Sequence, residues 1–123
     1  PFYAGTITLE QRLDLTLNGS TSVRLVVDGF AATVVDVRVN GASAGQIVWS
    51  PHELEIGEHL KDGRNTISID LVNTLRNLLG PHHHRLGELL SVSPHSFEDE
   101  ANWTDIYQFV PFGMSGVRLV IGE

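Results

Sequence analysis

The sequence contains no cysteine. This absence excludes a disulfide framework, a thiolate-bound metal and a cysteine nucleophile. The sequence also lacks any apolar run approaching the roughly 18–20 residues of a membrane-spanning helix, so we expect no membrane partner. The start of the sequence also lacks the charged and then apolar stretch that is typical of a signal peptide. Because the chain begins at Pro1 without a methionine, we interpret it as an excerpt from a larger protein.

Basic side chains are few and scattered along the sequence. Eight Lys and Arg residues stand against fifteen Asp and Glu residues, which gives a formal net charge of −7. Nucleic-acid binding requires clustered basic side chains that neutralise phosphates, so we expect no nucleic-acid partner. Neutral ligands such as sugars are compatible with this charge. A length of 123 residues fits one compact domain, and we expect a single domain over 1–123.

Alternation of apolar and polar residues is the strongest structural pattern. Between Thr6 and Leu17 the odd positions are apolar except for Gln11, and the even positions are polar. A two-residue period predicts a strand with one face on a core. Similar runs, separated by turn sequences such as Asn18-Gly19-Ser20 and Asn40-Gly41, predict further strands. These strands cover about 23–28, 35–40, 45–49, 53–56, 67–71 and 117–121, with one helical turn at 58–60.

The predicted fold follows from these short strands. No amphipathic helix of ordinary length is present, and antiparallel strands joined by turns form sandwiches or barrels. We predict an all-β antiparallel β-sandwich with one long irregular loop segment, and a barrel is the alternative. Trp49 lies at the inward register of its strand, so we expect it in the core, and stacking on a sugar ring is the alternative. The other predicted core residues are Leu9, Leu13, Leu15, Val35, Val37, Ile67, Ile69, Leu119 and Ile121.

The two-residue period fails between Asn73 and Trp103, and long loops of this kind tend to be functional. The segment contains the run His82-His83-His84. Histidine can ligate a metal, transfer protons or hydrogen-bond a sugar. Consecutive loop histidines fit the spacings of metal sites poorly. A polar loop with buried structural histidines is therefore the main interpretation, and ligand contact and a metal site are the alternatives.

Carboxylates cluster in the same segment, at Phe97-Glu98-Asp99-Glu100 and at Asp105. Paired carboxylates can hydrolyse a glycosidic bond, and several oxygen ligands can hold calcium. No companion motif accompanies them, so we interpret the cluster as a solvated acidic loop. We predict no catalytic residue and no cofactor, and calcium is an alternative that no motif supports.

A small set of side chains in and beside this segment suits a sugar ligand. Aromatic faces can cover the apolar patches of a sugar ring, and arginine can fork onto a pair of hydroxyls. Histidine can donate or accept a hydrogen bond near neutral pH. The predicted ligand-binding residues are Arg76, His82, His83, Trp103 and Tyr107, and no metal ligand is predicted.

Four stretches of the sequence resemble a known family. They are Pro1-Phe2-Tyr3-Ala4-Gly5-Thr6, Val37-Arg38-Val39-Asn40-Gly41, Leu60-Lys61-Asp62-Gly63-Arg64-Asn65-Thr66-Ile67 and Phe109-Val110-Pro111-Phe112-Gly113-Met114-Ser115-Gly116-Val117. Together they resemble the sugar-binding, galactose-binding-like jelly-roll of glycoside hydrolase family 2 and of related large bacterial glycosidases, including rhamnosidase-like proteins. The resemblance covers nearly the whole chain and implies a jelly-roll sandwich.

The resemblance also implies a function. In such enzymes the catalytic acid and nucleophile usually belong to a separate barrel domain, so the chain would be a non-catalytic accessory domain of a bacterial glycoside hydrolase. Its partners would be carbohydrate and the catalytic domain of the same parent chain, in the cytoplasm or outside the cell. The alternatives are an autonomous carbohydrate-binding module and, less favoured, a metal-binding domain that uses His82–His84.

Overall fold

The computed structural model describes residues 1–19 and 22–122. Contacts between Cα atoms divide the chain into two compact units. The sandwich unit comprises Thr6–Val72 and residues 113–122, and the loop unit comprises Pro1–Gly5 and Asn73–Phe112. Each unit is described below by itself. The expectation of a single domain over 1–123 stays a prediction.

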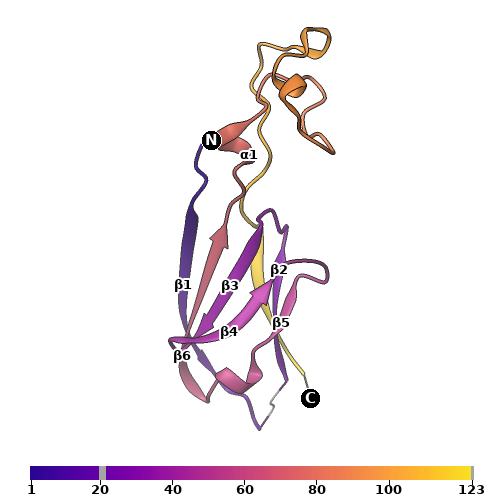
Figure 1. Cartoon of the computed structure of the whole chain (residues 1–123). Coiled ribbons are helices and arrows are strands. Elements are labelled where there is room, and N and C mark those ends of the chain that lie inside the picture. Colours follow the sequence, from indigo (N-terminus) through magenta and orange to yellow (C-terminus); the bar gives the residue numbers. More distant parts are fainter. Residues whose placement is uncertain (20–21, 123) are drawn as a thin grey trace. The chain divides into compact units, whose positions relative to one another are not determined.

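The sandwich unit contains two antiparallel sheets (Figure 1). The larger sheet has the strand order β1 (Thr6–Leu15), β6 (Gly63–Val72), β3 (Val34–Val39) and β4 (Ala42–Ile47). The smaller sheet has the order β5 (Glu53–Glu55), β2 (Val23–Asp28) and β7 (Gly116–Ile121). A single turn of 3-10 helix, Gly57–His59, follows β5. The predicted antiparallel β-sandwich is confirmed, and the finer jelly-roll assignment stays a prediction.

The turn residues adopt the backbone that their sequences favour. Asn40 and Gly41 join β3 to β4 with φ angles of 52° and 84°, as a tight hairpin requires. Asn18 and Gly19 also have positive φ angles, of 50° and 79°. Ser20, the last residue of that predicted turn, lies outside the described residues.

The core is built from alternate positions of the central strands. Of the predicted core residues, those on β3 and β6 are buried: Val35, Val37, Ile67 and Ile69. Strand β2 adds the inward row Val23, Leu25 and Val27, and Ile56 is fully buried beside it. The register is as predicted, because Thr8 and Asp14 on the opposite face of β1 are exposed.

Several residues that were predicted to be buried in the core are not buried. Leu9 is 43% exposed and Ile121 is 47% exposed, while Leu13, Leu15 and Leu119 are only half-buried. These residues do lie on the inner faces, because Leu9 pairs with the buried Ile69 and Leu119 with the buried Leu25. They belong to β1 and β7, each of which is the edge strand of its sheet. At an edge, alternation predicts which face a side chain lies on, but not whether other residues bury it.

The prediction that Trp49 packs in the core is also wrong. Strand β4 begins at Ala42, directly after the hairpin, and ends at Ile47, two residues before the tryptophan. Trp49 is 77% exposed. The strand was expected about three residues later in the sequence, and the inward register therefore does not extend to Trp49.

A polar cluster on the outer face ties three strands of the larger sheet together. Asp70 on β6 accepts hydrogen bonds from Thr8 Oγ1 at 2.6 Å on β1 and from Arg38 Nη2 at 3.2 Å on β3. The Arg38 guanidinium, followed by the Thr8 hydroxyl, lowers the pKa of the Asp70 carboxyl below its usual value. Asp70 is therefore ionised across the ordinary pH range.

The loop unit contains short helices, α1 (Arg76–Leu79), η2 (Pro94–Phe97) and η3 (Glu100–Asn102). The buried side chain of Asn77 fastens this unit internally: it donates to the carbonyl oxygen of Val110 at 2.9 Å and accepts from the Val110 amide at 2.8 Å. Within 1–19 and 22–122, no helix has the length and apolar character needed to cross a membrane.

Candidate functional site

The loop unit contains a pocket of about 130 Å³. Three of the predicted ligand-binding residues, His82, His83 and Trp103, line it. The other lining residues are Leu79, Pro81, Ser96, Phe97 and Asp99. The pocket therefore combines aromatic faces, an aliphatic patch, a hydroxyl and one carboxylate.

Backbone pairing positions the consecutive histidines. The carbonyl oxygen of His82 accepts from the Gln108 amide at 2.7 Å, and that of His83 accepts from the Thr104 amide at 2.9 Å. His84 and Trp103 form an isolated antiparallel bridge. Because successive side chains on extended backbone point in opposite directions, adjacent histidines meet different surroundings.

His82 is held within a cluster of rings. Its Nε2 lies 2.8 Å from the carbonyl oxygen of Asn77, and a carbonyl only accepts, so Nε2 carries the proton of that bond. The imidazole also contacts the rings of Phe2, Tyr107 and Phe109 at centroid distances of 5.5, 5.7 and 5.6 Å. His82 is therefore a positioned wall of the pocket.

His83 has the opposite orientation of its ring nitrogens. Its Nδ1 donates to the carbonyl oxygen of Thr104 at 2.9 Å, which leaves Nε2 as the acceptor of a neutral ring. The imidazole stacks on Trp103, with centroids 4.7 Å apart and planes inclined by 18°. Tyr107 meets the same imidazole edge-on at 4.5 Å. The orientation of the His83 ring is thus fixed by the Thr104 carbonyl and by Trp103.

Asp99 supplies the carboxylate of the pocket. Its Oδ2 accepts from Asn102 Nδ2 at 2.7 Å and from the buried His84 Nε2 at 3.3 Å. The Asn102 hydrogen bond, with a smaller contribution from His84, lowers the pKa of Asp99 below its ordinary value. The carboxylate is ionised near neutral pH and, with two oxygens, can accept further hydrogen bonds.

The two predicted stacking residues are accessible. Trp103 is 52% exposed and its Nε1 donates to Asp105 Oδ1 at 3.1 Å, which fixes the indole. Tyr107 is 51% exposed and lies against His83. Trp103 borders the pocket, whereas Tyr107 supports one of its walls from behind.

Arg76 is the predicted site residue that does not join this group. Its Nη2 donates to the carbonyl oxygen of Gly87 at 3.3 Å, and it does not line the pocket. Its Nη1 is buried and has no hydrogen-bond partner among the described residues. The structure therefore brings together four of the five predicted residues and separates the arginine from them.

Sequence reasoning missed the supporting residues of the site. It treated Asp99 as part of a solvated acidic loop, considered His84 only as a structural histidine or an alternative metal ligand, and assigned no role to Asn77 or Asn102. The contacts of Asn77 with Val110 and of His84 with Asp99 join residues far apart in the sequence, so no local pattern reveals them. Asn102 lies three residues after Asp99, and this local contact was not considered. In the described part of the chain, no three His, Cys, Asp or Glu side chains are grouped so that they could hold a metal ion.

The fold is similar to part of a solved glycosidase. The structure of a rhamnosidase from Novosphingobium sp. PP1Y matches with a TM-score of 0.60 and 24% sequence identity. The match covers 96% of this chain and 11% of the rhamnosidase chain. Comparison with models of known protein families gives no match, and comparison with curated proteins gives no similar sequence. The likeness establishes a shared fold, and the chain corresponds to a small part of that larger protein.

Proposed function

We propose that the chain is a non-catalytic accessory domain of a glycoside hydrolase and that the pocket of the loop unit contacts carbohydrate. The observation that carries this proposal is the fold match, in which nearly the whole chain corresponds to 11% of a rhamnosidase chain. The galactose-binding-like resemblance of the sequence points in the same direction. Fold alone does not define a ligand, so the argument for sugar rests on the chemistry of the pocket.

The pocket offers what a sugar ring requires. An exposed indole face at Trp103 can cover the C–H groups of a ring, while the lining side chains of His83 and Asp99 can hydrogen-bond hydroxyls. Leu79 and Pro81 form an aliphatic wall. Such a wall suits the methyl group of a 6-deoxy sugar, so we propose a rhamnose-type unit as the ligand.

The pocket is poorly suited to hydrolysis. Glycosidases use two carboxyl groups separated by about 5–9.5 Å, one of them protonated to act as the acid. Among the described lining residues Asp99 is the single carboxylate, and its lowered pKa keeps it ionised. A second, protonated carboxyl group to act as the acid is therefore lacking among the described lining residues of this pocket. Catalysis would reside on another domain of the parent chain, the partner that we propose for this one.

The experiment is to incubate the purified chain with aryl glycosides that include an aryl α-L-rhamnoside. We expect no release of chromophore above the buffer control. In parallel, titration with L-rhamnose followed by tryptophan fluorescence should give a weak, saturable change that the Trp103→Ala variant lacks. Chromophore release that co-purifies with the chain would contradict the accessory role.

A second candidate function is that of an autonomous carbohydrate-binding module that uses the sandwich unit. The observation in its favour is Trp49, which is 77% exposed beside a groove of about 420 Å³. Gln46, Glu53 and Glu55 also line this groove, and they can bond sugar hydroxyls. Loss of sugar binding in Trp49→Ala, with Trp103→Ala unaffected, would favour this candidate over the first.

A further inference from the structure

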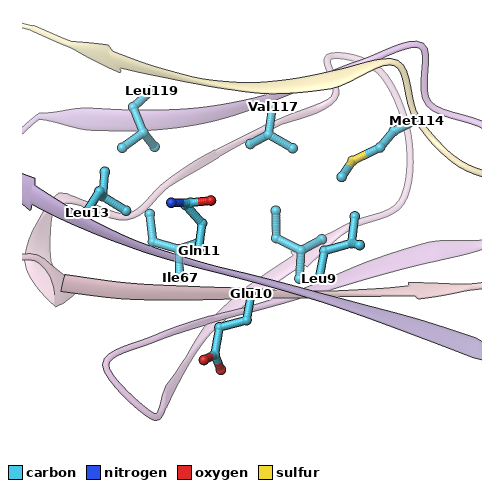
Figure 2. Close-up of a pocket in the computed structure, with 9 residues that line it drawn as sticks. Leu9, Glu10, Gln11, Leu13, Ile67, Met114, Val117 and Leu119 are labelled. Carbon is cyan, nitrogen blue, oxygen red and sulfur yellow. The ribbon is translucent and has the colours of Figure 1, made fainter.

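A groove of about 460 Å³ runs along one edge of the sandwich unit (Figure 2). Its walls are the inner faces of β1 and β7, represented by Leu9 and Leu13 on one side and Val117 and Leu119 on the other. These side chains face inward yet stay partly open to solvent. The groove is thus an uncovered part of the core. The remaining lining residues are Glu10, Gln11, Ile67, Ile69 and Met114.

The strand orders explain why the core is open on this side. At the opposite edge of the sandwich the two sheets meet, because a Cβ added at Gly45 of β4 would lie 3.0 Å from Leu54 Cδ1 of β5. From that edge the larger sheet continues through β3 and β6 to β1, whereas the smaller sheet stops at β7. Strand β1 therefore has no opposing strand among the described residues.

We propose that the groove is the docking site of one additional β-strand, which pairs with the free edge of β7 and covers the inner face of β1. The strand would come from the parent polypeptide outside the described residues, and this source rests on the proposed function. In the rhamnosidase of the same fold, the matched region is 11% of the chain. Most of that polypeptide lies outside the match and is a source of such segments.

A strand fits this groove better than another occupant. Strand β7 pairs with β2 on one side alone, so its other edge presents backbone groups without a ladder partner among the described strands. A neighbouring strand would lie about 4.8 Å from β7 and about 10 Å from the larger sheet, the spacings of an ordinary sandwich. A sugar would find mostly aliphatic walls here, since the charged head of Glu10 points away from the groove.

The polar residue of the groove specifies the strand further. Gln11 lies in the inward row of β1, and its amide points into the groove between Ile67 and Leu119. Its Nε2 donates to the adjacent carbonyl oxygen of Arg12, which is exposed. If a strand covers the groove, the polar atoms of this amide that face it need a hydrogen-bond partner on that strand. We therefore infer a strand with alternating apolar side chains facing inward and one polar side chain opposite Gln11.

The test uses the whole 123-residue chain and a short synthetic peptide of alternating threonine and valine with a lysine at each end. Peptide binding is followed by NMR methyl shifts of Val117 and Leu119 and by amide exchange in β7. We expect these methyl groups to shift and exchange at the free edge of β7 to slow by about tenfold or more. The control is the same peptide with alternate amides N-methylated, which keeps the side chains and removes the ladder.

A matched pair of variants separates the groove from the rest of the surface. Leu9→Lys places a charge in the groove at a position that is 43% exposed, so the fold should tolerate it. Thr16→Lys adds the same charge at an exposed site beyond β1 and should bind the peptide like the wild type. Folding of both variants is checked by their amide spectra.

Three outcomes would overturn the proposal. They are no change in β7 at high peptide concentration, equal binding of the N-methylated peptide, and a homodimer through β7 that the peptide does not dissociate. The last would make a second copy the occupant. None of these readouts involves sugar or the loop unit, so failure of this proposal is distinguishable from failure of the proposed function.

Discussion

His83 stacks on Trp103 with ring centroids 4.7 Å apart and an angle of 18° between the planes. The pairing uses one face of the indole, and the tryptophan as a whole stays 52% exposed. The imidazole is itself held by Thr104 and met edge-on by Tyr107. The indole is therefore preorganised, and a ligand that stacks on it would not have to order the ring.

Replacement of this indole tests its role as a binding face. Trp103→Ala should weaken rhamnose binding about tenfold or more, because it removes the stacking surface, and Trp103→Phe should retain part of the affinity. The measurement is the dissociation constant by NMR titration. Amide spectra of the free proteins provide the control for folding. Equal affinities for the wild type and Trp103→Ala would place any sugar elsewhere.

Asn77 should stabilise the loop unit through its paired hydrogen bonds with Val110. Asn77→Ala leaves the half-buried N–H and C=O of Val110 without these partners, and we expect a cost of about 1 kcal/mol in the local opening free energy. Amide exchange at Val110 measures this quantity. Leu78→Ala, at a neighbouring residue that is 48% exposed, serves as the control and should change exchange far less. Similar exchange in the two variants would show that the Asn77 bonds contribute nothing.

Truncation of a side chain on the inner faces of the sandwich unit should lower the stability more when that side chain is buried than when it is exposed. Ile69→Ala removes a buried side chain and should destabilise the protein by about 2–5 kcal/mol. Leu9 is the cross-strand partner of Ile69 on the same face and is 43% exposed. Leu9→Ala should therefore lower the free energy of unfolding clearly less than Ile69→Ala. Chemical denaturation of both variants gives the comparison. Equal losses would mean that Leu9 is covered in solution.

The Arg38–Asp70 pair should make the sandwich unit sensitive to acid. The folded-state pKa of Asp70 lies below its unfolded value, so the unfolded state binds protons first as the pH falls. The contribution of Asp70 is complete above its unfolded pKa of about 4 and declines through the folded pKa. Asp70→Asn should thus show a shallower loss of stability between about pH 5 and pH 2. Parallel acid-unfolding curves for variant and wild type would contradict this linkage.

The strands of the sandwich could be predicted because their physical cause is local. Alternation fixes which face of β1, β3 or β6 is apolar, and Asn40-Gly41 favours the positive φ angles of a hairpin. Cover is a property of the assembled sheets. No pattern within β1 reveals that the opposing sheet has no strand above it, which is why Leu9 was wrongly predicted to be buried. Ile121 was wrongly predicted for a related reason, because it ends β7, the edge strand of the smaller sheet.

The candidate site was predictable in its residue types and not in its connections. Histidine and tryptophan are conspicuous where periodicity fails, and His82, His83, Trp103 and Tyr107 do assemble. Arg76 was predicted on the same chemical grounds, yet its guanidinium donates to the carbonyl oxygen of Gly87 and does not line the pocket. The contact between His84 and Asp99 depends on how an irregular loop folds back on itself, for which sequence spacing gives no rule.

The most direct test of the central claim is a site-resolved NMR titration of the isotopically labelled chain with L-rhamnose, with D-glucose as the comparison sugar. We expect weak, saturable shifts at the Trp103 indole, the His83 imidazole and the Asp99 amide. These shifts should be larger for the 6-deoxy sugar, because the Leu79 and Pro81 wall accommodates its methyl group. Saturation with shifts confined to Trp49, or an unchanged spectrum for both sugars at high concentration, would contradict carbohydrate contact at this pocket.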